Sequence, residues 1–339
     1  MQWAFALESP QSRANIRQQA EDFAVTEVLG FEPSGEGQHR MLWIEKRNTN
    51  TDWLARQLAR FAGVSPRDVG YAGLKDRHAI TQQWFSLDLA GREEPQWDEF
   101  NSDDYRILNV AAHNRKIRKG TLQGNRFRLT LRNIEGDPDE MELRLQTIAR
   151  DGVPNYFGEQ RFGRDGDNIN QAWKMLQGEI KVKDRTRRGL YLSAARSLLF
   201  NAVLSERVLQ SSWNRLLPGE AAMLAGSQSF FSVDRIDDAT QARLEQWDIH
   251  PSGPLWGRGQ SPVSDEALRL EQDVLSNYRD WLAPLENVGL KQERRPLRLQ
   301  VHELEWQWKD EATLELQFQL EAGSYATSVL RELCLLNPS

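Results

Sequence analysis

The side chain best suited to covalent chemistry is the carboxylate of Asp76, in the segment GYAGLKDRHA at residues 70–79. Glycines let this segment turn tightly, and the cations Lys75 and Arg77 flank Asp76 on both sides. A carboxylate close to cations stays ionised even when partly desolvated, as a carboxylate nucleophile must. The same pattern is also typical of a turn aspartate with surface charges around it, so the local sequence leaves both interpretations open.

The remaining candidates for catalysis or metal binding are weaker. His78 has no identifiable carboxylate partner, and His39, His78 and His113 lack metal-ligand spacing. The single cysteine, Cys334, excludes a disulfide within the chain and a cysteine-based zinc cluster. The segment GRDGD (163–167) lacks the Lys-Ser/Thr of a phosphate-binding P-loop and is interpreted as a turn before a helix. We therefore expect neither a metal nor a cofactor.

The distribution of charge indicates an anionic partner, although the net charge is -6. Residues 113–132 contain no acid and seven basic residues: Arg115, Lys116, Arg118, Lys119, Arg126, Arg128 and Arg132. A second basic run lies at 181–188, with Asp184 as its one acid. Each run alone could be a solvated face, but two in an acidic protein favour a polyanion. Within the first run, GNRF (124–127) combines an amide and a ring with arginines, as base-reading segments do, or is an ordinary strand edge.

Length and composition are typical of a cytoplasmic protein with about two domains, since the chain has 339 residues. With 39% hydrophobic residues it can bury a core without disulfides or metals. No segment approaches the roughly 18 apolar residues of a membrane span. The apolar run at 3–7 is too short for a signal peptide and has no basic residue before it. We expect no membrane contact.

Residue patterns in the first part of the chain predict strands and helices without a βαβ order. Alternating residues predict strands at 22–28, 41–45, 80–87 and 126–131. Asn50 or Thr51 can cap a helix whose Leu54, Leu58 and Phe61 share one face, with Gly63 as its stop. Ser65-Pro66 predicts a short helix, and residues 70–76 a loop. We therefore expect an α+β fold with a mostly antiparallel sheet.

From about residue 150 the pattern becomes helical. Apolar spacing predicts helices near 169–176, 192–202 and 268–282, and the Gly- and Pro-rich segment 253–262 predicts a loop. Near the end of the chain, 304–308 and 314–320 alternate around a turn at 310–311. Such a hairpin needs a larger sheet to join. We expect it to join the strands of the N-terminal part, which makes the middle an insertion.

The segment GYAGLKDRHAITQQW (70–84) resembles the signature of the tRNA pseudouridine synthase D (TruD) family. Five further blocks agree with that family in the same order: EDF (21–23), GTLQGNRF (120–127), VPNYFGEQRFG (153–163), SAARS (193–197) and AGSYATS (322–328). Together they span nearly the whole chain, which is far more specific than one motif.

The resemblance implies isomerisation of a uridine in tRNA, typically at position 13, to pseudouridine. It implies a pseudouridine synthase catalytic fold, with a mixed, mainly antiparallel sheet flanked by helices. This catalytic domain would comprise residues 1–150 and 300–339, and an inserted second α/β domain residues 151–299. The partner would be tRNA, bound through the backbone contacts of Arg115, Lys116, Arg118 and Lys119. Neither a cofactor nor an obligatory protein partner is implied.

The resemblance also assigns roles to single residues. Asp76 falls on the catalytic position, and Phe23, Asn125 and Tyr325 fall on positions that line the uridine pocket. Arg17 matches a basic position that pairs with the catalytic carboxylate. Tyr325 stands where a phenylalanine is expected, and an alanine at position 20 stands where a proline is usual. We expect the ring of Tyr325 to stack on the uracil and its hydroxyl to be secondary.

Two alternatives remain open at the level of the sequence. The chain could be a non-catalytic RNA-binding or RNA-folding module that shares the basic runs and the aromatic residues. It could also be a small-molecule enzyme that uses the same loop, but the basic run would then have no purpose. For the catalytic interpretation, attack by Asp76 at C1′, attack at C6, and proton removal at C2′ on a glycal path all remain possible.

Overall fold

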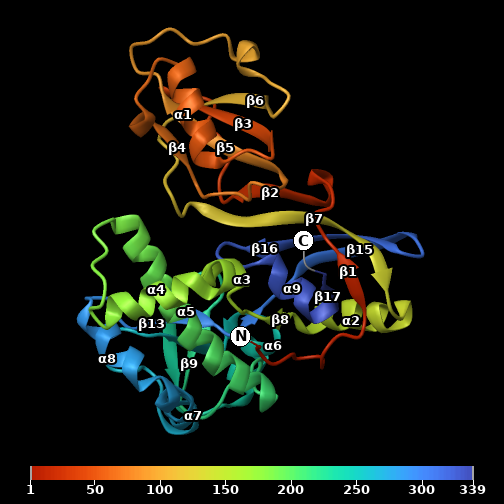
Figure 1. The fold of residues 1–339 in the computed structure, drawn as a ribbon, viewed down its shortest axis with the longest axis vertical. Helices are drawn as coiled ribbons and strands as arrows, with labels where there is room; N and C mark the ends of the chain where they lie inside the picture. The colour runs from red at the N-terminus through yellow and green to blue at the C-terminus, as the bar shows by residue number, and fades with distance from the viewer. Residues whose placement is uncertain (1, 338–339) are drawn as a thin grey trace. The chain divides into compact units, whose positions relative to one another are not determined.

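The computed structural model describes residues 2–337. Its internal contacts form two compact units. The sheet unit comprises Gln11–Pro138, Val301–Gly323 and Cys334–Ser339. The helical unit comprises Met1–Pro10, Asp139–Gln300 and Ser324–Leu333. The two units are described separately, and Figure 1 labels their helices and strands.

The sheet unit is built mainly of strands. Its strands are β1 (Arg13–Asn15), β2 (Phe23–Leu29), β3 (His39–Arg47), β4 (Val69–Tyr71), β5 (Ile80–Asp88), β6 (Tyr105–His113), β7 (Leu122–Glu135), β15 (His302–Asp310), β16 (Thr313–Glu321) and β17 (Leu335–Leu336). Its helices are α1 (Thr51–Phe61) and three short 3-10 turns: η1 (Ala20–Asp22), η2 (Pro66–Asp68) and η3 (Trp97–Phe100).

One continuous sheet joins these strands in the order β15-β16-β7-β2-β5-β3-β6, with β1, β4 and β17 attached beside this path. The β2–β5 and β1–β17 pairs are parallel, and the other pairs are antiparallel. The hairpin β15–β16 joins β7 along eight residue pairs, from Leu314↔Leu131 to Glu321↔Gly124. The prediction that the C-terminal hairpin joins strands of the N-terminal part is therefore confirmed.

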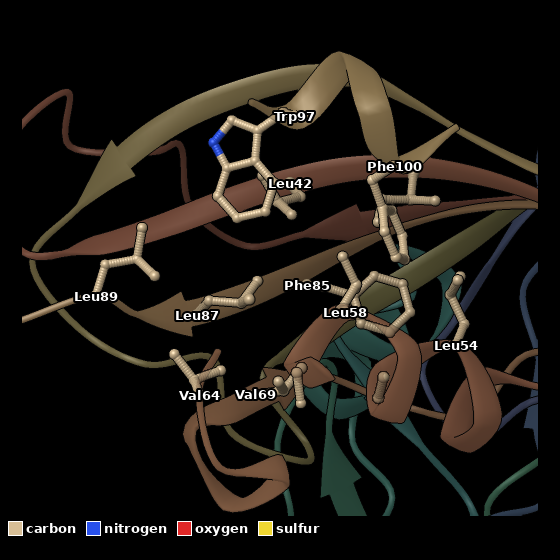
Figure 2. Close-up of a cluster of buried hydrophobic side chains, with 13 residues drawn as sticks. Leu42, Leu54, Leu58, Val64, Val69, Phe85, Leu87, Leu89, Trp97 and Phe100 are labelled. Carbon is tan, nitrogen blue, oxygen red and sulfur yellow. The ribbon is translucent and has the colours of Figure 1, made fainter. Parts of the chain in front are cut away.

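Helix α1 covers one face of this sheet. The side chain of Asn50 accepts a hydrogen bond from the amide of Asp52 at 3.0 Å and so caps the helix, as the sequence predicts. Leu54 and Leu58 are fully buried and belong to the same apolar cluster as Phe85 of β5. Figure 2 shows these side chains between the helix and the strands. This packing fixes both ends of the segment that runs from α1 through β4 to β5.

The helical unit contains the remaining elements. Its helices are α2 (Pro138–Asp151), α3 (Glu159–Phe162), α4 (Asp167–Leu176), α5 (Arg185–Leu209), α6 (Asp238–Glu245), α7 (Asp265–Leu275), α8 (Arg279–Asn287) and α9 (Ala326–Leu333), with 3-10 turns η4 (Arg164–Gly166) and η5 (Ser276–Tyr278). Its short strands are β8 (Val153–Pro154), β9 (Glu220–Leu224), β10 (Phe230–Val233), β11 (Ile249–His250), β12 (Ser252–Leu255), β13 (Glu293–Pro296) and β14 (Arg298–Leu299).

Helix α5 forms the centre of the helical unit. Its buried residues contribute to two apolar clusters, one around Phe157 and Phe200 and one around Leu199 and Leu285. The unit also contains a three-stranded sheet, β10-β9-β11, and the strand pairs β12-β13 and β14-β8. Buried ion pairs are part of the same interior: Arg207 pairs with Glu220 at 2.9 Å.

Three local predictions are wrong. The helix expected at 268–282 is broken at η5, where Ser276 and Asn277 bond back to the carbonyls of Asp273 (2.7 Å) and Val274 (3.3 Å). Such side-chain bonds compete with the helix. The loop expected at 253–262 begins as strand β12, which pairs with β13. The loop expected at 70–76 begins as strand β4, where Gly70 is needed because a Cβ would lie 2.3 Å from the carbonyl of Ile117.

The α+β class with a mainly antiparallel sheet is confirmed. The bounds of the compact units differ from the predicted domains, because 139–150 and 324–333 pack with the middle of the chain. Arg144 of α2 donates to the carbonyl of Glu332 at 3.0 Å, and Ser328 donates to that of Tyr156 at 2.9 Å. The assignment of 151–299 as an inserted domain concerns chain order rather than contacts and stays a prediction.

Candidate active site

Asp76 lies in the loop between β4 and β5, residues 72–79, and its side chain is 28% exposed. Its carboxylate accepts a hydrogen bond from the Arg17 guanidinium at 3.2 Å and forms an ion pair with it. The same guanidinium lies over the ring of Phe23, 3.9 Å from the ring centroid. The structure therefore brings together Asp76, Arg17 and Phe23, three of the residues selected from the sequence.

The cations next to Asp76 in the chain do not act as the sequence suggested. Lys75 turns inward and pairs with Glu27 of β2 at 3.0 Å, and their side chains are 3% and 0% exposed. Glu27 also accepts a hydrogen bond from the amide of Trp84 at 2.9 Å. Arg77 is exposed. The ion-pair partner of Asp76 is Arg17, 59 residues away in the chain, rather than its sequence neighbour Lys75.

Lys46 of β3 holds the backbone of Asp76 and was not predicted as a site residue. Its buried ammonium donates to the carbonyl of Asp76 at 3.0 Å and to that of Thr49 at 2.7 Å. Burial disfavours the charged form and lowers the pKa of Lys46 to about 8, although the negative charge of Asp76 opposes this. Lys46 follows Leu42 and Ile44 on the buried side of β3, and that inward position was the available signal.

Phe23 and Asn125 lie on one face of the sheet, on the neighbouring strands β2 and β7. Phe23 is buried and meets the ring of Phe127 edge-on at 6.2 Å. Asn125 stands opposite Glu27 in the register of the two strands. Its side-chain oxygen is buried and has no hydrogen-bond partner within residues 2–337. That oxygen is a free acceptor on the same face of the sheet as Glu27, which pairs with Lys75.

The basic segment 115–119 connects β6 to β7 and continues towards the Asp76 loop. The amide of Gly120 donates to the carbonyl of Ala72 at 2.9 Å, which joins the two loops. The exposed members of the segment are Arg115, Arg118 and Lys119. Lys116 is half-buried, and its ammonium donates to the backbone carbonyl of Arg67. Lys116 is therefore the least suited of the four to contact a phosphate.

Tyr325 belongs to the helical unit, where it precedes α9. Its ring is half-buried and meets Phe157 edge-on at 6.1 Å. Its hydroxyl accepts a hydrogen bond from Arg161 of α3, which also donates to Ser193 of α5 at 3.0 Å. The hydroxyl, which we expected to be secondary to the ring, is thus bonded to a charged group. Arg161 and Ser193 were not predicted as site residues, although both lie in segments that resemble the family.

Three candidates set aside on sequence grounds lie in ordinary structural surroundings. His113 accepts a hydrogen bond from the amide of Ser34 at 3.0 Å and stands opposite His39 in the β3–β6 register, and His78 is exposed. Among residues 2–337, no three His, Cys, Asp or Glu side chains are placed to hold a metal ion. No helix in the same part of the chain is long and apolar enough to span a membrane.

Comparison with known proteins decides the family. The family model described as tRNA pseudouridine synthase D (TruD) matches residues 2–181 and 166–333. This chain belongs to the TruD family. A tRNA pseudouridine synthase D from Nitrosococcus oceani is 52% identical over 332 residues, covering 97% of this chain and 93% of that protein. One from Methylococcus capsulatus is 49% identical over 326 residues, covering 96% and 92%.

The TruD fold is also found among solved structures. A crystal structure of a protein from Methanosarcina mazei that carries the TruD name matches with a TM-score of 0.76 at 23% identity. The match covers 97% of this chain and 95% of that one. At this low identity the likeness concerns the fold, and it confirms the expected catalytic fold class of the TruD family.

Proposed function

We propose that this TruD-family chain isomerises a uridine in tRNA to pseudouridine, with position 13 as the target and Asp76 as the catalytic carboxylate. The observation that supports Asp76 most directly is its placement. Its carboxylate is partly exposed and pairs with Arg17, and its backbone carbonyl accepts a hydrogen bond from Lys46. The sequence similarity to proteins named tRNA pseudouridine synthase D supports tRNA as the partner. We further propose the cytoplasm as the compartment.

The chemistry suits a site built around one carboxylate. The C1′–N1 bond breaks, the uracil turns, and C5 bonds to C1′ while the C5 hydrogen leaves as a proton and N1 gains one. Substrate and product are isomers, so the conversion needs no net oxidant or reductant. Asp76 can serve by attack at C1′, by attack at C6, or by removing a proton at C2′. Its ion pair with Arg17 holds the carboxylate in place for each of these paths.

The surrounding residues support recognition of an extruded uracil. A base inside a stem must leave its stack before its glycosidic bond can be reached. The unpartnered oxygen of Asn125 can accept the N3–H of uracil, since a buried acceptor without a donor is costly. Phe23 supplies a ring in the sheet unit, and the exposed cations Arg115, Arg118 and Lys119 can contact phosphates. Because its segment resembles the family, we also propose Tyr325 of the helical unit as a ring that stacks on the uracil. We propose the two-part organisation, 1–150 with 300–339 around 151–299, as the family's catalytic and inserted domains.

The activity is tested with purified protein and an unmodified tRNA transcript labelled with tritium at C5 of uridine. We expect tritium release to solvent together with pseudouridine mapped at position 13, and no product from a transcript that carries cytidine there. The competing function is a non-catalytic RNA-binding or RNA-folding module. Tight binding of the transcript without any pseudouridine would favour that module and contradict the proposal.

A further inference from the structure

Leu74 is an exposed apolar residue two positions before Asp76. Its relative exposure is 63%, close to the 65% of Leu143 on α2. Single exposed leucines are common on protein surfaces and need no explanation by themselves. What distinguishes Leu74 is that the backbone on both sides of it is fixed, whereas the side chain is left in solvent.

Two buried side chains hold the peptide groups that flank Leu74. Gln83 donates to the carbonyl of Gly73 at 3.2 Å, and the hydroxyl of Thr51 accepts from the amide of Lys75 at 3.2 Å. Thr51 and Gln83 are also bonded to each other at 3.0 Å. Because these contacts come from α1 and β5, which pack in the same core, the backbone of Leu74 has little freedom to move.

The side chains of the neighbouring residues Leu74 and Lys75 point in different directions. Lys75 turns inward to Glu27, where both side chains are buried. Leu74, one residue earlier, remains in solvent. A buried alternative for Leu74 would be favourable in a flexible loop, since covering an aliphatic side chain is stabilising. The hydrogen bonds at Gly73 and Lys75 oppose such a movement, and the loop presents an apolar side chain two residues before the candidate nucleophile.

One cation, Lys119, lies near the start of the loop that carries Leu74. Lys119 is exposed and lies over the ring of Tyr71, with its nitrogen 5.4 Å from the ring centroid. The bond from Gly120 to Ala72 joins the basic segment to the start of the loop that carries Leu74. A polyanion held by Lys119 would therefore lie near the loop in which Leu74 is the exposed aliphatic side chain.

We propose that Leu74 inserts into the base stack of the RNA and fills the space left by the extruded uridine. The inference rests on the proposed function, because it concerns the same RNA and the same target base. Apolar side chains that enter a base step unstack it and stabilise the distorted state. Extrusion carries an unstacking cost, so a residue that replaces the lost contacts raises the population of RNA in which Asp76 can reach the uridine.

The test compares Leu74→Ala with the matched control Leu143→Ala, which removes an equally exposed leucine from α2. The transcript carries 2-aminopurine beside the target uridine, because this base becomes fluorescent when it unstacks. We expect Leu74→Ala to lower kcat/KM by about tenfold to a hundredfold and to weaken the fluorescence rise on binding. Leu143→Ala should match the wild type in both measurements, and Leu74→Met should retain most of the activity.

A second transcript, in which the target uridine has no pairing partner, separates insertion from damage to the loop. Extrusion costs less there, so we expect the deficit of Leu74→Ala to shrink several-fold. An equal deficit on both transcripts with unchanged fluorescence would overturn the inference, as would full activity of Leu74→Ala. Wild-type protein that forms no pseudouridine would overturn the proposed function as well, so the two failures are distinguishable.

Discussion

The loop that carries Asp76 is held by its backbone, whereas Tyr325 is held by the polar end of its own side chain. At Asp76 the carbonyl accepts from buried Lys46, and the carboxylate is left to its ion pair with Arg17. At Tyr325 the hydroxyl accepts from Arg161, and the ring packs on Phe157. In each region an arginine contacts the side chain: Arg17 contacts the carboxylate of Asp76, and Arg161 contacts the hydroxyl of Tyr325. Neither arginine is the residue that holds the backbone there.

This difference decides what a substitution reports. Replacing the carboxylate of Asp76 leaves the contact of its carbonyl with Lys46 in place, so the backbone position is kept while the charge that pairs with Arg17 is lost. Removing the hydroxyl of Tyr325 takes an acceptor from Arg161, so position and stacking change together. Substitutions that remove the donor to the carbonyl of Asp76 should therefore lower activity strongly although they leave the carboxylate itself unchanged.

The largest expected effect among such substitutions is that of Lys46→Met. It leaves the carbonyls of Asp76 and Thr49 without their donor, and a buried unsatisfied group costs about 1–3 kcal/mol. A displacement of about 1 Å at the reacting group can cost about a hundredfold in rate. We expect kcat to fall by about that factor with KM little changed, in steady-state assays of pseudouridine formation.

The matched control is Lys309→Met, which breaks an exposed pair with Glu315 in the same compact unit. Exposed pairs of this kind contribute about 0–1 kcal/mol, so kcat should be unchanged. A Lys46→Met variant that is as active as this control would show that the hydrogen bond from Lys46 to the carbonyl of Asp76 does not position Asp76.

An intermediate effect is expected at Tyr325. Tyr325→Leu removes both ring and hydroxyl, and loss of base stacking worth about 1–3 kcal/mol should lower kcat/KM by one to two orders of magnitude. Tyr325→Phe removes a hydrogen bond to a charged group and should lower kcat/KM by roughly tenfold.

A double-mutant cycle with Arg161→Met separates the two contributions at Tyr325. If the hydroxyl acts through Arg161, Tyr325→Phe should add little to Arg161→Met. Fully additive losses would show that the hydroxyl acts elsewhere, and full activity of Tyr325→Leu would exclude a stacking role for the ring.

The smallest effect per residue is expected in the basic segment. Each lost phosphate contact should reduce the salt slope of tRNA binding by about 0.7–0.9, equally for cognate and non-cognate tRNA. We expect this for Arg115, Arg118 and Lys119 changed singly to Gln, and a smaller change for Lys116, whose ammonium is bound to a carbonyl. Kd measured over a range of salt concentrations gives the slopes.

Arg150→Gln is a suitable control for these measurements, because Arg150 is an exposed arginine paired with Asp151 on α2. An unchanged slope after all four substitutions would mean that the basic segment is a solvated face.

Residue periodicity predicted those parts of the fold in which neighbours in the chain determine the structure. The spacing of Leu54 and Leu58 predicted α1, and two alternating segments predicted the hairpin β15–β16. The break at η5 depends on side-chain bonds from Ser276 and Asn277 that a hydrophobic pattern does not contain. The same limit applies to β12, whose Gly and Pro resemble a loop until its partner strand is known.

The candidate site was predictable as a set of residues but not as a set of contacts. Asp76 followed from its loop and its charges, and Arg17 from the family resemblance. The direction of Lys75 could not be inferred, because adjacency in the chain does not fix where a side chain points. Lys46 was missed because a lysine usually lies on the surface, although its place after Leu42 and Ile44 on β3 indicated an inward side chain. The structure adds that its ammonium donates to the carbonyl of Asp76.

The central claim is that the carboxylate of Asp76 performs the chemistry, while Lys46 holds the backbone of Asp76 through a contact that does not involve its side chain. Single-turnover pseudouridine formation by Asp76→Asn, measured with the tRNA Kd and the thermal unfolding midpoint, tests it most directly. We predict a rate at least about a thousandfold lower, the order expected when a catalytic nucleophile is removed, with Kd and midpoint close to those of the wild type. Pseudouridine formation near the wild-type rate would contradict the account.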